Sequence, residues 1–103
     1  MQVKVYHTAF EETPVHIATV DTPCAVHEEA CEYAYRWTQN IHDSWSMKMP
    51  ADGNDAVKVV ADLHVDDEGK TWGLRSTSMR DHMLVDGRKF EVAMMGFKEV
   101  DFA

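Results

Sequence analysis

The sequence has few residues of the kinds that cross-link or divide a chain. It contains two cysteines, three prolines and five glycines in 103 residues. No stretch rich in proline, glycine or serine is long enough to act as a linker, so we expect a single domain over residues 1–103. The chain also lacks an apolar signal segment at its start and any hydrophobic run that could span a bilayer. We therefore expect a cytoplasmic protein with reduced thiols.

Sequence motifs of known chemistry are also missing. The chain contains no glycine-rich phosphate loop, no dinucleotide fingerprint and no HExxH motif. Its carboxylates occur in runs, whose neighbouring members point away from each other on a helix, so no acid-base pair is predicted. The sequence favours a noncatalytic protein without a cofactor over an enzyme.

Positive charge is scarce. The chain has 18 acidic and 10 basic residues, for a formal net charge of −8. This sign repels phosphate, so binding to nucleic acid or to an anionic membrane would need a local basic patch. The basic residues are dispersed among acids along the chain, which predicts neither direct nucleic-acid binding nor membrane binding. The dispersed residues include Lys58, Arg75, Arg80, Arg88, Lys89 and Lys98.

The acidic residues form short groups that would suit a protein partner with a basic surface. Such a face could imitate the phosphates of DNA and bind a nucleic-acid-handling protein by electrostatic complementarity. The competing explanation is simple solubility, to which net charge also contributes. The residues predicted to bind the partner are Glu28, Glu29, Glu32, Asp62, Asp66, Asp67 and Glu68.

The first twenty residues predict two strands. QVKVYHT, residues 2–8, alternates apolar and polar side chains, with Val3 and Val5 on one face. VHIATV, residues 15–20, alternates again after the interruption at Pro14.

The next twenty residues predict an amphipathic helix. Asp21 or Thr22 can cap its free amides, Pro23 suits the first helical position, and the helix should run to about His42. One set of apolar side chains falls within an arc of about 100°, the width of a core-facing stripe. The stripe consists of Val26, Ala30, Tyr33, Ala34, Trp37 and Ile41.

Two hairpins are predicted after the helix. VKVVADLHV, residues 57–65, alternates and is followed by the turn DDEG and the returning KTWGL. HMLV and RKFEVA flank Asp86-Gly87, which suits a type I′ turn. Residues 43–55, before the hairpins, should form a loop or extend the helix. The helix needs an apolar partner, so the predicted fold class is α+β, with one amphipathic helix packed on an antiparallel β-sheet built of hairpins, in two layers.

Cys24, His27 and Cys31 could present three ligands to a metal if all lie on one helix. Structural zinc sites, however, use two close pairs of Cys or His, and no second pair follows at a matching spacing. We therefore predict no metal site. Two helical turns would also hold the thiols roughly 10 Å apart, beyond disulfide reach.

The segment RSTSMRDH, residues 75–82, contains the residue types of a hydrolytic triad. Adjacent Asp81 and His82 would point to opposite faces of an extended chain, so one cannot orient the other. A turn capped by Ser78 and Asp81 is the favoured interpretation. The alternative is an anion site, in which arginine forks bind the ligand and His82 transfers protons. Its residues would be Arg75, Ser76, Ser78, Arg80 and His82.

The run GLRSTSMRDHMLVDGRKFEVAMMGFKEV, residues 73–100, resembles the carboxy-terminal segment of small proteins from phages, plasmids and conjugative elements, including YodL-like domains. In that family a Ser-x-Ser-x-x-Asp turn precedes a hairpin that closes on Gly-Phe and an acidic residue. The resemblance implies a mobile-element setting and no particular activity. The matching positions are Ser76, Ser78, Asp81, Gly96, Phe97 and Glu99.

Three functions follow as hypotheses. The first is a noncatalytic acidic interaction protein, encoded by a phage or mobile element, that binds a basic or nucleic-acid-handling protein as a DNA mimic or anti-defence inhibitor. The second is a small anion-binding protein or enzyme that uses residues 75–82. The third is a virion structural or assembly protein. The sequence leaves the oligomeric state open.

Overall fold

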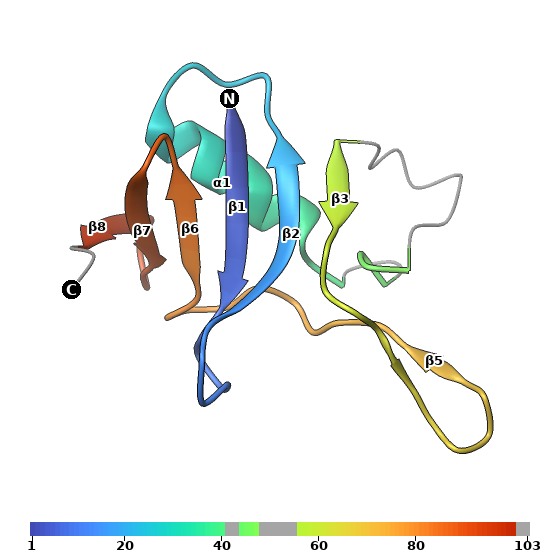
Figure 1. Ribbon diagram of the computed structural model, residues 1–103. Coiled ribbons are helices and arrows are strands. Elements are labelled where there is room, and N and C mark those ends of the chain that lie inside the picture. The colour runs from blue at the N-terminus through green and yellow to red at the C-terminus, as the bar shows by residue number, and fades with distance from the viewer. Residues whose placement is uncertain (41–43, 48–55, 101–103) are drawn as a thin grey trace.

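The computed structural model describes residues 1–40, 44–47 and 56–100. Six strands form an antiparallel sheet in the order β3-β2-β1-β6-β7-β8, and two more form a separate ribbon, β4-β5. One helix, α1, crosses one face of the larger sheet (Figure 1). The strands are β1 (Gln2–His7), β2 (Val15–Asp21), β3 (Val57–Val59), β4 (His64–Val65), β5 (Thr71–Trp72), β6 (His82–Val85), β7 (Arg88–Val92) and β8 (Phe97–Val100), and the helix is α1 (His27–Trp37).

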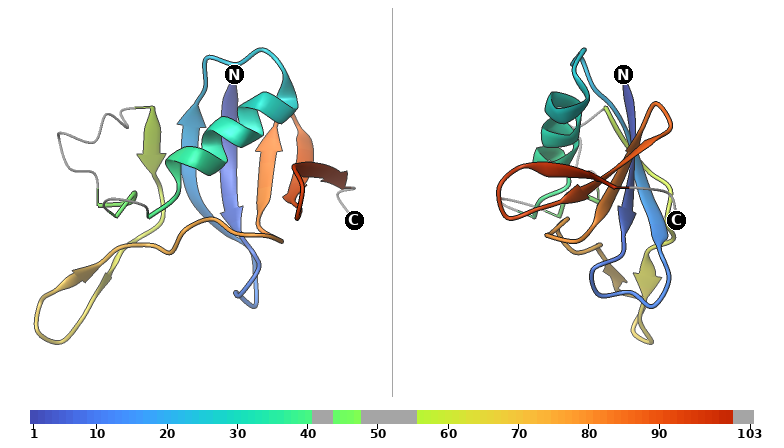
Figure 2. Two further views of the ribbon diagram at one scale, coloured as in Figure 1. Left: turned by 180° about the vertical axis from the view of Figure 1, so that it is seen from behind. Right: turned by 90° about the vertical axis from the view of Figure 1, so that its left-hand side faces the viewer.

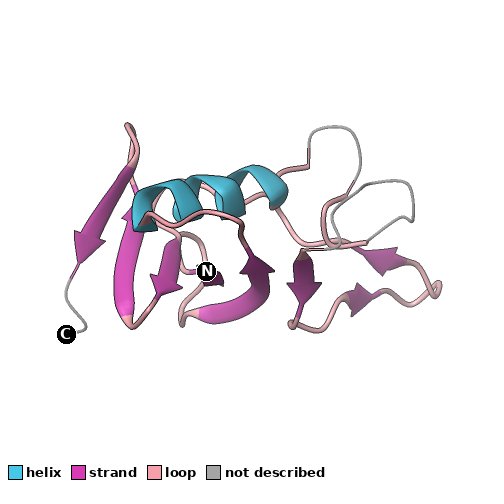
Figure 3. Cartoon of the chain, turned by 90° about the horizontal axis from the view of Figure 1, so that it is seen from above, coloured by secondary structure: helices cyan, strands magenta, loops and turns pink. Residues whose placement is uncertain are grey.

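This arrangement confirms the predicted α+β architecture. Viewed from above, α1 lies on one side of the sheet and no described helix or strand covers the other side (Figure 3). Both predicted N-terminal strands form, and β1 alternates as expected, with Val3 and Val5 fully buried on the helix side of the sheet. No helix in the described residues is long and apolar enough to cross a membrane.

The helix is shorter than predicted and begins later. Val26, with extended backbone angles, is its N-cap, and no side chain caps the first turn. The predicted start at Pro23 is wrong because Thr22 has another role: its hydroxyl donates to the Met1 carbonyl at 2.9 Å, while the Met1 ammonium donates to the Thr22 carbonyl at 2.7 Å. The helix ends at Trp37, before the predicted end at His42, which lies outside the described residues.

Small side chains bring α1 close to the sheet. Ala30, Cys31 and Ala34 of α1 are fully buried in the core, on the side of the helix that packs against the sheet. Val26 was predicted to join this stripe but is 54% exposed, because it precedes the helix. Ile41 and most of the loop 43–55 lie outside the described residues.

The predicted strand 57–65 is interrupted. β3 ends at Val59, and the amides of Val60 and Ala61 both donate to the Ile17 carbonyl, which turns the chain away from the sheet. Residues 64–65 then pair with β5 and project beyond β3 (Figure 2). Val65 is consequently 55% exposed.

The second predicted hairpin forms as expected. Asp86 and Gly87 have φ angles of +50° and +76°, as a type I′ turn requires. β6 and β7 pair on either side of it, from Val85–Arg88 to His82–Glu91. The register fixes which side chains lie under α1 and which point to the uncovered face of the sheet.

Candidate functional site

The predicted acidic residues occupy two separate places. Glu28, Glu29 and Glu32 are exposed on α1, and Glu28 and Glu32 lie opposite residues of the β7-β8 turn. Asp62 and residues 66–68 lie in and before the β4-β5 ribbon, which projects beyond the opposite edge of the sheet at β3 (Figures 1 and 2). The structure therefore does not combine the two groups into one array.

Asp66 has a structural role in the β4-β5 ribbon. Its carboxylate accepts hydrogen bonds from the Glu68 and Lys70 amides and from Trp72 Nε1, each at 2.9 Å. These bonds lower the pKa of Asp66, and the bond from Trp72 contributes most to the lowering. Asp67 and Glu68 remain exposed at the tip.

A groove of about 420 Å³ separates α1 from the β7-β8 turn. We call it the helix–hairpin groove. Glu28 and Glu32 lie on its helix side, and Tyr35 and Phe97 contact each other edge to face with ring centres 6.2 Å apart. The remaining lining residues are Val92, Ala93, Met94 and Gly96.

The β7-β8 turn carries two exposed methionines beside this groove. Met94 and Met95 are 84% and 91% exposed. The Ala93 amide donates to the Gly96 carbonyl, and Gly96 has a φ angle of +80° that favours glycine. The sequence pattern did not reveal that both methionines would lie at a turn beside the acids of α1.

In the 75–82 segment, Arg75 is fully engaged. Its guanidinium donates to the Glu11 carboxylate at 2.9 and 3.2 Å and to the Asp81 carboxylate at 2.7 and 2.8 Å. This fork is therefore directed at the protein's own carboxylates, not at a ligand. The other donors and acceptors predicted for an anion site are also dispersed. Ser76 Oγ accepts from the Asn40 amide at 2.8 Å, Arg80 is exposed, and His82 pairs with Glu91 at 3.3 Å on the uncovered face of the sheet.

Asp81 is the centre of the capped turn that the sequence predicted. Its carboxylate, which is fully buried, accepts from the amides of Ser78, Thr8 and Ala9 as well as from Arg75. Burial alone would raise the pKa of Asp81, but these hydrogen bonds outweigh it and hold the pKa at about 2. The segment is thus an internally satisfied anchor between the β1-β2 loop and β6.

Sequence reasoning missed His7, which lies beside this anchor. His7 Nε2 is 3.1 Å from Thr77 Oγ1 and 3.9 Å from Asp81 Oδ2. A catalytic relay uses the two ring nitrogens for different partners, whereas here one nitrogen faces both. Thr77 is also buried and accepts from Thr38 Oγ1 at 2.8 Å, so this cluster supports the fold rather than exposing a nucleophile. His7 lies 70 residues from Thr77, and no local pattern could have paired them.

Cys24 and Cys31 are free thiols. The argument that placed them on one helix is wrong, because Cys24 precedes α1. Burial raises the pKa of the Cys31 thiol to about 12, and the charge of Glu28 acts in the same direction. Among the described residues, no three Cys, His, Asp or Glu side chains are grouped to hold a metal ion.

Comparison with known proteins adds no relative: no family model, no curated protein and no solved structure matches this chain. The function must be argued from the surfaces themselves.

Proposed function

We propose that the protein is a noncatalytic interaction protein whose helix–hairpin groove binds a basic segment of a protein partner. The observation that supports this is the lining of the groove, in which the carboxylates of Glu28 and Glu32 face an apolar wall that contains Tyr35, Phe97 and Met94. A basic, nucleic-acid-handling protein is the class of partner that this lining suits.

The lining suits lysine or arginine side chains in particular. Both residues have an apolar stem and a charged head, and the stem packs on apolar surface while the head remains at a polar site. In the groove, Met94 and Phe97 would contact the stem, and Glu28 or Glu32 would accept hydrogen bonds from the head. Bonds between charged groups are shorter and stronger than neutral ones.

The two methionines support binding of a segment rather than of a single ion. Methionine is flexible and polarisable, and it is frequent on surfaces that adapt to different partners. Met94 and Met95 are the most exposed large apolar side chains among the described residues. Covering them would remove apolar surface from water, which stabilises a complex by about 25 cal/mol for each Å² buried.

The arrangement favours this local mode over imitation of a continuous DNA backbone. A DNA mimic would present its charges as one array, but Glu28 and Glu32 lie in the groove beside β8, whereas the β4-β5 ribbon follows β3 at the opposite edge of the sheet. We therefore assign the partner site to Glu28 and Glu32 with the β7-β8 turn, and the ribbon acids are outside it.

The test uses a fluorescein-labelled arginine-rich peptide and measures its anisotropy against increasing protein. The groove variant Glu28→Gln/Glu32→Gln should bind at least about tenfold more weakly, since close charge pairs couple by 1.5 kcal/mol or more. The matched control is Asp67→Asn/Glu68→Gln, which removes the same charge from the ribbon and should change affinity less than about twofold.

Met94→Ser/Met95→Ser provides a test that leaves the charge unchanged. It should also weaken binding, and the loss should persist at high salt because it removes apolar contact. If the groove and ribbon variants lost affinity equally and the methionine variant lost none, the peptide would be binding through net charge alone. That result would contradict the proposed binding site in the groove.

A further inference from the structure

The face of the sheet opposite α1 gathers positive charge that the sequence disperses. Side chains that are paired across neighbouring strands point to the same face of a sheet. Lys4 pairs with Thr19, which pairs with Lys58, and on the other side Lys4 pairs with Leu84, which pairs with Lys89. Three lysines therefore lie in one row across the sheet, on β3, β1 and β7.

A second row runs beside the first. It passes from His16 through Tyr6 and His82 to Glu91 and then to Lys98. The alternate positions of these strands, such as Val5 and Met83, are buried on the helix side. We call the side that carries the two rows the open face; it is the side towards the viewer in Figure 1.

Among the residues that the structure describes, no carboxylate forms an ion pair with a lysine of the open face. The ion pairs between described residues all use arginine or histidine, and none uses Lys4, Lys58, Lys89 or Lys98. Glu91, a carboxylate on this face, pairs with His82 at 3.3 Å. Lys4, Lys58 and Lys98 are exposed, so their ammonium groups can reach a ligand.

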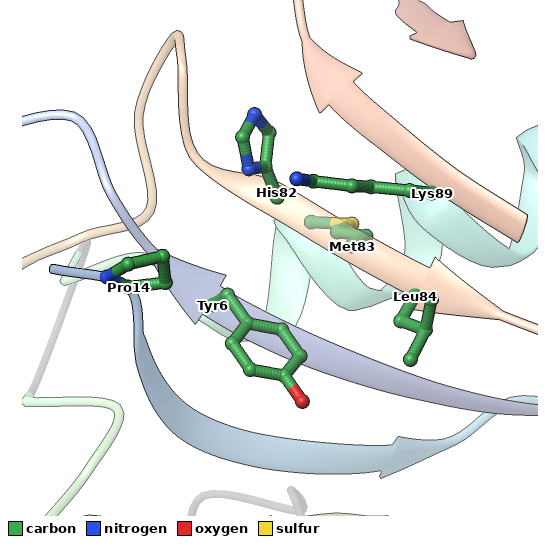
Figure 4. Close-up of a pocket in the computed structure, with 6 residues that line it drawn as sticks. All are labelled: Tyr6, Pro14, His82, Met83, Leu84 and Lys89. Atoms are coloured by element: carbon green, nitrogen blue, oxygen red, sulfur yellow. The ribbon is translucent and has the colours of Figure 1, made fainter. Parts of the chain in front are cut away.

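A shallow hollow of about 160 Å³ lies between the two rows. Figure 4 shows Tyr6, Pro14 and Leu84 around it, with the Lys89 side chain extending towards His82. The Tyr6 ring stacks on His16, with centroids 4.9 Å apart and planes at 21°. His16 does not line the hollow, so it braces the Tyr6 ring from outside.

Spacing and shape indicate the class of ligand. Strands lie about 4.8 Å apart, so lysines on every second strand are roughly 10 Å apart and span the sheet. A row of separated positive charges suits a flexible chain of phosphates better than one small anion. An aromatic ring beside such a row suits an unstacked base, because every base can stack on a flat ring. Bases inside a duplex have no face available for such a contact.

We infer that the open face binds single-stranded nucleic acid, with its lysines on the phosphates and Tyr6 against a base. This surface lies on the opposite side of the sheet from α1, and the inference does not depend on the helix–hairpin groove. Binding should be sensitive to salt, because each phosphate contact releases counterions. For four lysines on a single strand, the logarithm of affinity should fall with the logarithm of salt concentration with a slope of about −3.

The test measures anisotropy of a fluorescein-labelled oligothymidine of about 15 nucleotides at low salt. Lys4→Glu/Lys89→Glu should lower the affinity at least about tenfold, since it replaces two attractions with repulsions. Arg36→Glu/Lys70→Glu changes the charge equally on α1 and the ribbon, and should lower the affinity much less. Tyr6→Leu, with charge unchanged, should lower it about fivefold or more, as expected for one stacked base.

Three outcomes would overturn the inference. The first is no binding by the unaltered protein at low salt, and the second is an equal loss in the two charge variants. In the third, light scattering shows a protein that self-associates at low salt and becomes monomeric in Lys4→Glu/Lys89→Glu. That result would assign the open face to contact with a second copy of the chain. A duplex of mixed sequence serves as the last comparison, and binding equal to that of the single strand would contradict the role given to Tyr6.

Discussion

Asp81 shows how much of this small fold depends on one residue. Its buried carboxylate receives amide hydrogen bonds from Thr8, Ala9 and Ser78, which belong to segments far apart in the sequence. Arg75 supplies the compensating positive charge. A buried charge without its partner is costly, so the stability of this region depends on the pair more than on either residue alone.

Replacing Arg75 should therefore destabilise the protein strongly. We expect Arg75→Met to reduce the free energy of unfolding by roughly 2 to 4 kcal/mol. This is somewhat less than the loss of a fully buried pair costs, because Arg75 is partly exposed. Urea denaturation at neutral pH measures the change. Arg36→Met is the control: its pair with Glu32 is exposed and 4.0 Å apart, and its loss should cost about 0.5 kcal/mol or less. Similar losses for both variants would contradict the anchoring role.

Stability should also fall with acidification, for reasons that belong to two residues. Burial lowers the pKa of His7 from its ordinary value of 6.5, despite the nearby charge of Asp81. Below that ordinary value the unfolded chain binds a proton that folded His7 resists, so the free energy of unfolding falls between about pH 7 and pH 5. Asp81 acts in a lower window: its folded pKa of about 2 lies below the ordinary 3.8, so its contribution is lost from about pH 4 downwards.

Urea denaturation across this pH range tests the upper window. Burial lowers the pKa of His16 as well. His7→Gln should therefore remove part of the slope between about pH 7 and pH 5, and His7→Gln/His16→Gln should remove more of it. An unchanged slope in the double variant would show that other groups cause the loss.

The sequence predicted the role of Asp81 within its turn but not the partners that make it important. Ser78 is three residues away, so a capped turn is visible as a local pattern. Glu11 and His7 reach the same cluster only after β1 pairs with β6. Contacts of this kind depend on strand register, which a single sequence does not specify.

At the scale of elements, local rules worked where the chain had no competing interaction. Strand β1 follows its alternation, and the Asp-Gly turn joins β6 to β7. Strand β2 forms where predicted, but its alternation is interrupted because a register shift against β1 leaves Ile17 and Ala18 both buried. The helix start was wrong because Thr22 bonds to Met1, a partner 21 residues away, instead of capping the helix. The strand predicted over 57–65 is interrupted because the Ile17 carbonyl accepts hydrogen bonds from two successive amides, those of Val60 and Ala61.

The β6-β7 turn gives the sharpest test at this scale. Gly87 has a φ angle of +76°, and a Cβ at this position would meet nothing within 4 Å, so a side chain there would suffer backbone strain alone. We expect Gly87→Ala to lower the free energy of unfolding by about 1 to 2 kcal/mol. Asp86→Asn is the matched control, since Asn tolerates the same backbone region, and it should be nearly neutral. Equal effects of the two changes would mean that the turn is not held in this conformation.

At the scale of the whole molecule, charge is sorted by face. Arginines pair with carboxylates on the helix side and in the anchor, while lysines from four strands meet on the open face. Along the sequence these lysines are separated by acids, which is why they looked dispersed. Strand pairing brings the lysines together in space, with Glu91 beside them on the same face. The net charge of −8 is a sum over the whole chain and does not reveal the group of lysines on the open face.

The β4-β5 ribbon is the part of the molecule that should be separable from the rest. His64 pairs with Trp72, so the two chain ends at the base of the ribbon are about 5 Å apart and two glycines can join them. The ribbon exposes Val65 and half of Trp72, and the chain next to it is held by the bonds of Val60 and Ala61 to Ile17. Because little of the main core involves the ribbon, its removal should expose little apolar surface.

We expect the protein with residues 64–72 replaced by Gly-Gly to unfold in one cooperative transition, with a midpoint within about 5 °C of the intact chain. Calorimetry measures this, and hydrogen exchange of the intact protein should show ribbon amides exchanging before those of β1 and β2, whose strands lie in the core. A control deletion of the same kind in the β6-β7 hairpin should abolish the transition, because Met83, Val85 and Phe90 are buried there. If removal of the ribbon also abolished the transition, the ribbon would be an essential part of the fold rather than a separable element.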